Sequence, residues 1–222
     1  MAGRRALFIN FHGLGEPRRQ LLPGEEAFWL PREILDVWLA QAAQYPQVQI
    51  TFDDGNVSDF EIALPCLKAR GITAQFFVCA GHLDHPGHLA VGQLRELAAA
   101  GMGIGNHGMF HRDWRSLDDP TLLQEIVDAR DRLENLIGRK ISRAACPFGS
   151  YDRRVLRALR QAGYERVYTS DGGWAKAKNW IYPRNSVCRS DSGAVVDHLL
   201  REKPIGFAAS VRWLKRTVKR LR

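Results

Sequence analysis

The chain has 222 residues, enough for one domain with a sizeable core, and its 45% hydrophobic and 25% charged content is typical of a globular protein and excludes a disordered one. The net charge of +8 is concentrated in residues 201–222, which carry eight basic residues and one acid, so that residues 1–200 hold 24 basic and 23 acidic residues. A nearly neutral body gives no support for a nucleic-acid partner, and we expect none.

The sequence contains no segment that predicts export or membrane insertion. The apolar run 6–11 already includes Asn10 and is shorter than a secretory signal requires, and no run of about 18 apolar residues follows it. We therefore expect a cytoplasmic protein. Its four cysteines form no C-x-x-C pair, which excludes a zinc ribbon and predicts reduced thiols.

Apolar, β-prone runs alternate with amphipathic helical stretches along the chain. The expected strands are 6–11, 48–52, 73–79, 102–105, 144–146 and 167–169, and the expected helices are 31–44, 58–70, 91–100, 119–137 and 151–162. Pro65 should kink or split the second of these helices. The alternating order predicts parallel strands joined by crossover helices, in one α/β barrel-like domain over residues 1–200 whose active site lies at the carboxyl ends of the strands.

Two polar clusters fall at such strand ends. Asp53 and Asp54 directly follow strand 48–52, where neighbouring side chains diverge and can serve different roles, although Asp-Gly is also a common turn dipeptide. His107 and His111 follow strand 102–105, and on a helical turn their spacing of four puts both imidazoles within reach of one metal ion. Two histidines and one carboxylate are the ligand set of a catalytic zinc site with open positions, so we expect one divalent ion.

Three segments carry a more specific pattern: Thr-Phe-Asp-Asp-Gly at 51–55, the histidine pair at 107–111, and Cys-Pro-Phe-Gly at 146–149. Together they resemble the first, second and third signatures of the polysaccharide deacetylases, the NodB-homology domain of carbohydrate esterase family four, over about residues 5–190. The resemblance implies a distorted (β/α)7 barrel and a hydrolase that removes the N-acetyl group from an amino sugar.

The resemblance also implies a role for each site residue. Asp53 would be the general base, Asp54, His107 and His111 would bind Zn²⁺ or else Co²⁺ or Ni²⁺, and the Phe148 backbone N–H would help to form the oxyanion hole. These roles agree with the chemistry, because a metal polarises the acyl oxygen and lowers the pKa of a water, a free carboxylate accepts the proton, and an N–H stabilises the oxyanion.

The residue that would act as the general acid does not follow the pattern of the family. The family has a histidine after a late strand, and no such signature follows residue 180. Strand 6–11 ends in His12 instead, as a circularly permuted branch of the family would have it. We predict that His12 is the general acid, the alternative being a capping histidine in a Gly-rich turn. His198 lies in a helical pattern and is expected on the surface.

The third signature usually begins with an arginine that orients the base, and Ala145 stands in its place. Arg184 or Arg143 could substitute for it, and the sequence does not choose between them. Asp171 follows the last expected strand and either fixes the tautomer of His12 or forms a turn.

His82, His85 and His88 form a second histidine cluster. A second metal site is conceivable, but a polar loop next to the substrate is favoured, because Pro86 and two glycines leave the spacing loose. Loops 12–30, 81–90 and 171–182 are expected to shape the sugar pocket.

Residues 203–222 predict a basic amphipathic helix. Its apolar stripe falls at helical spacing and consists of Phe207, Val211, Leu214, Val218 and Leu221. Segment 207–222 could lie in the plane of an anionic membrane at the inner face or dock on the barrel as a final helix, and the two are nearly equally favoured. Membrane contact would suit a lipid-linked glycan, an intermediate of cell-surface or exopolysaccharide biosynthesis.

Other functions remain open from the sequence. The same site could serve an O-deacetylase or a deformylase acting on a related sugar. A non-catalytic glycan-binding member of the fold is supported by Ala145, and a membrane-docked scaffold by the tail, whereas the intact acid and histidine pairs favour an enzyme.

Overall fold

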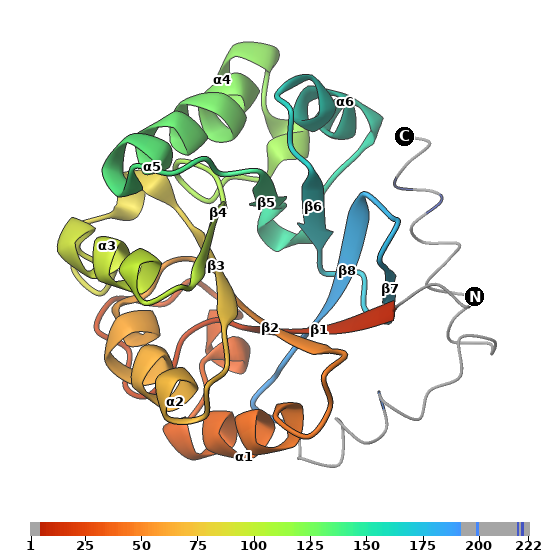
Figure 1. Ribbon diagram of the computed structural model, residues 1–222. Coiled ribbons are helices and arrows are strands. Elements are labelled where there is room, and N and C mark those ends of the chain that lie inside the picture. The colour runs from red at the N-terminus through yellow and green to blue at the C-terminus, as the bar shows by residue number, and fades with distance from the viewer. Residues whose placement is uncertain (1–4, 192–198, 200–216, 218, 220–222) are drawn as a thin grey trace.

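A computed structural model describes residues 5–191 together with 199, 217 and 219. Its strands form one sheet in the order β2-β3-β4-β5-β6-β8-β1-β7, and a further pairing of β1 with β2 closes the sheet into a barrel. All neighbours around the barrel are parallel, whereas the short β7 pairs antiparallel with the beginning of β1. Figure 1 shows the strands at the centre and the helices around them. The expected (β/α)7 barrel is confirmed.

The strands agree with the predicted ranges to within about one residue at each end, with two exceptions. They are β1 (Arg5–Phe11), β2 (Val48–Phe52), β3 (Ala74–Val78), β4 (Gly103–Asn106), β5 (Arg143–Ala145), β6 (Arg166–Thr169), β7 (Ala175–Lys176) and β8 (Ile181–Ser186). The sequence analysis missed β7 and β8. The omission of β8 matters most, because this strand closes the barrel between β6 and β1.

The helices lie between successive strands. They are α1 (Arg32–Ala42), α2 (Leu64–Ala69), α3 (Val91–Ala99), α4 (Asp119–Leu123), α5 (Ala129–Ile137) and α6 (Arg153–Gln161). Both longer predicted helices are interrupted: a π-helical turn, Asp59–Ala63, precedes α2 and its Pro65, and a second one, Gln124–Asp128, separates α4 from α5. Such turns misalign backbone carbonyls, and the Asn106 side chain donates hydrogen bonds to two of those in the second turn.

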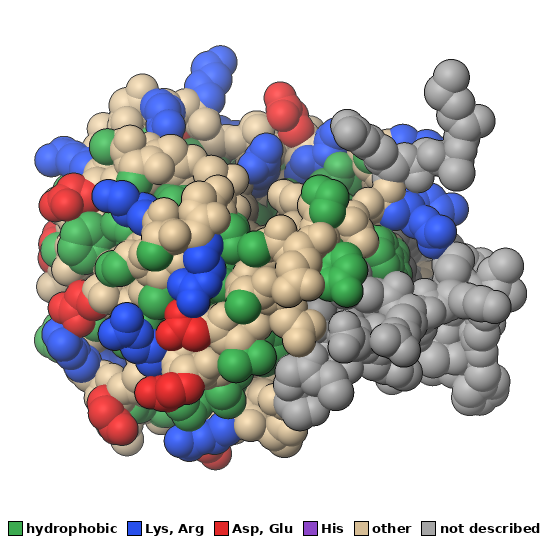
Figure 2. Space-filling view, turned by 60° about the horizontal axis from the view of Figure 1, so that its bottom comes forward, with side chains coloured by type: hydrophobic (Ala, Val, Ile, Leu, Met, Phe, Trp, Pro, Cys, Tyr) green, Lys and Arg blue, Asp and Glu red, His purple; other side chains and the backbone are tan. Residues whose placement is uncertain are grey.

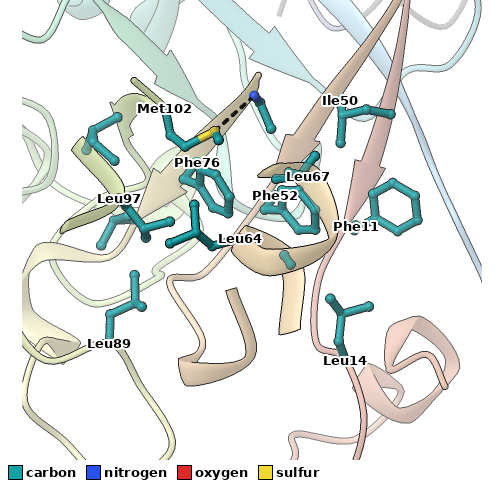
Figure 3. Packing of buried hydrophobic residues seen from close by; sticks show 14 of the residues in the cluster. Phe11, Leu14, Ile50, Phe52, Leu64, Leu67, Phe76, Leu89, Leu97 and Met102 are labelled. Carbon is teal, nitrogen blue, oxygen red and sulfur yellow. Dashed lines mark hydrogen bonds between the residues drawn. The ribbon is translucent and has the colours of Figure 1, made fainter. Parts of the chain in front are cut away.

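A stack of three phenylalanines fixes the register of the first strands. Phe11, Phe52 and Phe76 are cross-strand partners on β1, β2 and β3, and their ring centroids are 5.4 and 4.8 Å apart. Figure 3 shows Phe52 and Phe76 next to Leu64 and Leu67 of α2. Burying each ring contributes roughly 1.5–3 kcal/mol. Because this register is fixed, the residues that follow β1 and β2 are held side by side.

The opposite faces of the same strands point into the barrel. Phe8, Phe77, Ala145 and Tyr168 form a separate buried cluster there. Asn10 and Thr51, each next to a stacked phenylalanine in the sequence, are also fully buried, and Thr51 donates a hydrogen bond to the Asn10 amide oxygen at 2.6 Å. The barrel interior therefore carries polar groups as well as aromatic ones.

The described residues also bear on the predictions about membrane-spanning segments, the cysteines and the C-terminal helix. No helix in the described part of the chain is long and apolar enough to cross a bilayer. All four cysteines are free. Figure 2 shows a face on which basic and acidic side chains are interspersed. The predicted helix 203–222 lies outside the described residues except at Thr217 and Lys219, and His198 also lies outside them.

Candidate active site

The loops after the barrel strands meet at one cleft of about 1140 Å³. His12 follows β1, Asp53 and Asp54 follow β2, and His107 follows β4, and all four line the cleft. This is the arrangement that parallel strands impose, since their carboxyl ends share one end of the barrel.

Asp54, His107 and His111 form a group that could hold a metal ion. One ligand atom from each lies within 4.8 Å of the other two. The Asp54 Oδ1 atom is 3.5 Å from His107 Nε2 and 3.4 Å from His111 Nε2. Within the described part of the chain this is the one such group of three or more side chains.

Several features of these residues fit a metal. The His107 Nδ1 atom lies 2.9 Å from the Ala145 carbonyl oxygen, which favours a proton on Nδ1 and leaves Nε2 as the ligand atom. Asp54 Oδ1 is buried without a hydrogen-bond partner. Burial, outweighing the charge of Asp54, lowers the pKa of His111 to about 4, so its imidazole is neutral at pH 7. Burial lowers the pKa of His107, but the charges of Asp53 and Asp54 outweigh it and raise that pKa, so this imidazole would give up its proton when a metal binds. Carboxylate oxygens and imidazole nitrogens are donors that Zn²⁺ takes.

Backbone strain marks the same residues. Asp54, His111 and Phe148 have φ values of 78°, 52° and 56°, in the left-handed region that side chains other than glycine rarely adopt. Each such residue costs about 1–3 kcal/mol and persists only where its surroundings enforce it. Three of the four such residues in the described part of the chain line the cleft, the exception being Asp84, and this concentration is an independent indication of a functional site.

The predicted helical turn between His107 and His111 is wrong. The segment is a loop shaped by the fully buried carboxylate of Glu125, which accepts hydrogen bonds from the backbone N–H groups of Met109 at 2.7 Å and Phe110 at 3.2 Å. Gly108 has φ +93°, and a Cβ there would lie 2.3 Å from a Glu125 oxygen. The ring centroids of the two imidazoles are nevertheless only 5.0 Å apart.

Arg184 holds the carboxylate of Asp53. Its two terminal nitrogens donate to the two Asp53 oxygens at 2.6 and 2.7 Å, and the Asn10 side chain donates to Asp53 Oδ2 at 3.0 Å. Burial, the largest single influence, raises the pKa of Asp53, but the charge and hydrogen bonds of Arg184 together with the charges of His107 and His12 outweigh it, so the net pKa lies below the ordinary value. Arg143, the other candidate, instead donates to Gln75.

His12 lies next to Asp53, but Asp171 is not its partner. His12 Nε2 is 4.0 Å from Asp53 Oδ2, and Nδ1 is buried with no hydrogen-bond partner among the described residues. The Asp171 carboxylate accepts hydrogen bonds from Tyr151, Thr169 and Lys219. The expectation that Asp171 fixes the His12 tautomer is therefore wrong, because three other donors occupy that carboxylate.

Phe148 lies at the mouth of the cleft. Its side chain is 63% exposed, and its ring centroid is 4.4 Å from that of His111. The turn that it occupies follows β5 and begins with Pro147. The Phe148 ring thus contacts one ring of the metal-ligand group.

His82, His85 and His88 line the cleft but do not form a second group of three ligands among the described residues. The rings of His82 and His88 are 4.8 Å apart, and that of His85 is 6.4 Å from His82. Burial lowers the pKa of His82, and it brings that of His88 to about 4. The His88 imidazole is therefore neutral at pH 7.

The sequence analysis missed three buried polar residues near the site: Asn10, Glu125 and Asp59. Asn10 interrupts an apolar strand, and this interruption was a signal that could have been used. Glu125 and Asp59 lie in helical patterns in which an acid predicts solvent exposure. Asp59 is fully buried, and neither carboxylate oxygen has a hydrogen-bond partner among the described residues.

We expect Asp59→Asn to stabilise the protein at high pH. Burial, followed by the charges of Asp54 and Asp53, raises the pKa of Asp59 well above its ordinary value of 3.8. Because the folded pKa exceeds the unfolded one, the stability that Asp59 provides is complete below pH 3.8 and is lost as the pH rises to the folded pKa, at about 1.4 kcal/mol per pH unit. Thermal unfolding of both proteins should show a Tm gain for the variant that grows with pH.

The exposed Asp128 provides the matched control, since Asp128→Asn removes a carboxylate that is not buried. A Tm difference for Asp59→Asn that stays constant from pH 4 to pH 8 would rule out the raised pKa.

Comparisons with known proteins agree with this geometry. The family model described as polysaccharide deacetylase matches residues 40–167, more than half of the chain. The chain is 29% identical over 140 residues to YxkH of Bacillus subtilis, which bears the name of a polysaccharide deacetylase, and 29% identical over 125 residues to a chitooligosaccharide deacetylase of Rhizobium leguminosarum bv. trifolii. The matches cover 63% and 55% of this chain, and they span about half of the relatives, 50% and 56% of their lengths.

Solved structures share the fold. The Streptococcus pyogenes deacetylase PplD in complex with acetate superposes with a TM-score of 0.76 at 19% identity, over 90% of this chain and 100% of that one. IcaB from Ammonifex degensii superposes with a TM-score of 0.73 at 20% identity, over 90% and 98% of the two chains.

Proposed function

Because the chain belongs to the polysaccharide deacetylase family, we propose that it is a metal-dependent hydrolase that removes the N-acetyl group from an amino sugar. In this reaction water adds to the acyl carbon, the C–N bond breaks, and acetate and a free amine are released. The observation that carries the proposal is that an arginine-held carboxylate, Asp53, lies beside the Asp54–His107–His111 group in one cleft.

Asp54, His107 and His111 would hold one divalent ion, most readily Zn²⁺, with Co²⁺ or Ni²⁺ as alternatives of similar ligand preference. When bound, such an ion supplies Lewis acidity to the acyl oxygen and lowers the pKa of water toward ~7. The roles of base, acid and oxyanion donor belong to residues of the chain itself.

Asp53 acts as the general base that accepts the proton of the attacking water. Its orientation is supported by Arg184 and Asn10, whose hydrogen bonds leave the carboxylate no free rotation. Arg184 thereby takes the part of the arginine that the third signature would place at position 145. The lowered pKa keeps Asp53 ionised, which a base requires.

His12 acts as the general acid that protonates the leaving amine. Its Nε2 lies 4.0 Å from Asp53 Oδ2, so acid and base flank one position in the cleft. Strand β1, which carries His12, lies between β2 and β8. This position fits a permuted order in which the acid-bearing strand comes first. The Phe148 N–H would stabilise the developing oxyanion.

The substrate is an N-acetylated sugar or a lipid-linked glycan, an intermediate of cell-surface or exopolysaccharide synthesis at the inner face of the membrane. The cleft, at about 1140 Å³, exceeds the volume of a single small ligand. Leu22, Phe110 and Phe148 contribute exposed apolar side chains to its lining.

The test combines metal analysis with acetate release from a panel of N-acetylated sugars and lipid-linked sugars. We expect one metal ion per chain, acetate release that stops after chelation, and recovery when Zn²⁺ is returned. Acetate release only from lipid-linked members of the panel would assign the carrier-bound substrate. A protein that binds no metal and releases no acetate from any member would overturn the proposal and favour a glycan-binding role.

A further inference from the structure

The loop after β6 contacts two described residues near the C-terminus, Leu199 and Lys219. The indole N–H of Trp174 donates to the backbone carbonyl of Leu199 at 3.1 Å, and Leu199 itself lines the cleft. Three residues before this tryptophan, Asp171 accepts a hydrogen bond from the Lys219 ammonium at 2.8 Å. Leu199 and Lys219 therefore contact the rim of the cleft.

Lys219 joins two loops of that rim. Besides the Asp171 contact, its ammonium donates to the Gly149 carbonyl oxygen at 3.0 Å and lies 5.1 Å from the centre of the Tyr151 ring. The Tyr151 hydroxyl donates to the second Asp171 oxygen at 2.7 Å. The Asp171 side chain is only 5% exposed, so the ion pair is shielded from solvent on the side of the acid.

The turn that Lys219 contacts is strained. Phe148 and Gly149 are both left-handed, with φ of 56° and 61°, and a Cβ on Gly149 would lie 2.8 Å from the side chain of Ser170. The turn is thus pressed against the loop that carries Asp171. A conformation of this kind persists only where surrounding contacts enforce it. Lys219 supplies such contacts to both sides of the junction.

We propose that Lys219 is a positioning residue that clamps the Phe148–Gly149 turn against the Asp171 loop and so fixes the direction of the Phe148 N–H. The inference rests on the proposed function, in which that N–H stabilises the oxyanion. It gives Asp171 a role that differs from orienting His12, and it makes Lys219 a component of the rim of the cleft.

The test uses the full-length Lys219→Met variant, with Lys219→Arg as the conservative replacement and exposed Lys178→Met as the control. Small displacements of a catalytic group cost rate, so we expect kcat for acetate release to fall roughly 10- to 100-fold with KM little changed. Hydrogen exchange of the amides at 148–150 should accelerate, metal content should stay the same, and Lys219→Arg should recover both kcat and protection.

Two outcomes would overturn the clamp. One is unchanged exchange at 148–150 together with unchanged kcat in Lys219→Met. The other is a general loss of stability and metal content that Lys219→Arg does not restore, which would indicate a folding role. If the wild-type protein releases no acetate from any substrate, the exchange measurement alone decides, so failure of the proposed function is distinguishable from failure of the clamp.

Discussion

Asp53→Asn is expected to reduce kcat/KM for acetate release by roughly 10²–10⁴-fold, because the amide cannot accept the proton of the attacking water. The substitution preserves the shape of the side chain and one oxygen that Arg184 can donate to. Since Asp53 does not belong to the Asp54–His107–His111 group, the metal content of the variant should equal that of the wild type. Metal analysis and single-substrate kinetics on the same preparation check both parts.

The neighbouring residue provides the matched control. Asp54→Asn changes the same atoms one position along the chain, and there we expect loss of metal together with loss of activity. If Asp53→Asn kept its metal and stayed within about tenfold of the wild-type rate, well short of what a general base contributes, Asp53 would not be the base.

Arg184→Met is expected to destabilise the protein as well as to inactivate it. Arg184 is fully buried, and its removal leaves the carboxylate of Asp53 buried without its cationic partner. Breaking a buried ion pair in this way costs about 3–5 kcal/mol. Urea unfolding and acetate release, measured side by side, should both show the defect.

A double variant separates the two effects. In Arg184→Met with Asp53→Asn no unpaired charge remains inside the barrel, so stability should recover relative to Arg184→Met alone, while activity stays lost. Additive losses of stability in the double variant would contradict the pairing. Arg184→Lys should be an incomplete substitute, because an ammonium cannot make the bidentate contact.

The sequence was sufficient for those parts of the molecule that depend on local pattern and on the topology of parallel strands. Alternation placed β2 at its exact boundaries, and the rule that sites lie at carboxyl strand ends brought Asp53, Asp54 and His107 to one cleft. The predicted helical turn between His107 and His111 was wrong, but their short spacing in the sequence still put both rings near Asp54.

The parts that the sequence did not provide depend on contacts between distant residues. Arg184 reaches Asp53 across 131 positions, from a strand whose Pro183, Arg184 and Asn185 oppose a strand prediction. The Asp171 carboxylate accepts a hydrogen bond from Lys219, which lies 48 positions further along the chain. Glu125 is turned inward by a π-helical turn that leaves no mark in the hydrophobic periodicity.

The guanidinium that holds Asp53 comes from β8 and not from position 145 on β5. This also restricts how the barrel can change by mutation. Arg184 lies 5.1 Å from the centre of the Phe77 ring and 6.0 Å from that of Tyr168, and Ala145 packs in the same cluster as these two rings. A chain with arginine at both 145 and 184 would have to fit two guanidinium groups into one closely packed interior, and a chain with neither would leave a carboxylate buried and unpaired. Both single-step intermediates between the two arrangements are therefore unfavourable. Positions 145 and 184 should show strong epistasis, and a lineage that holds the Asp53 carboxylate from β8 is separated from the alternative arrangement by a fitness valley.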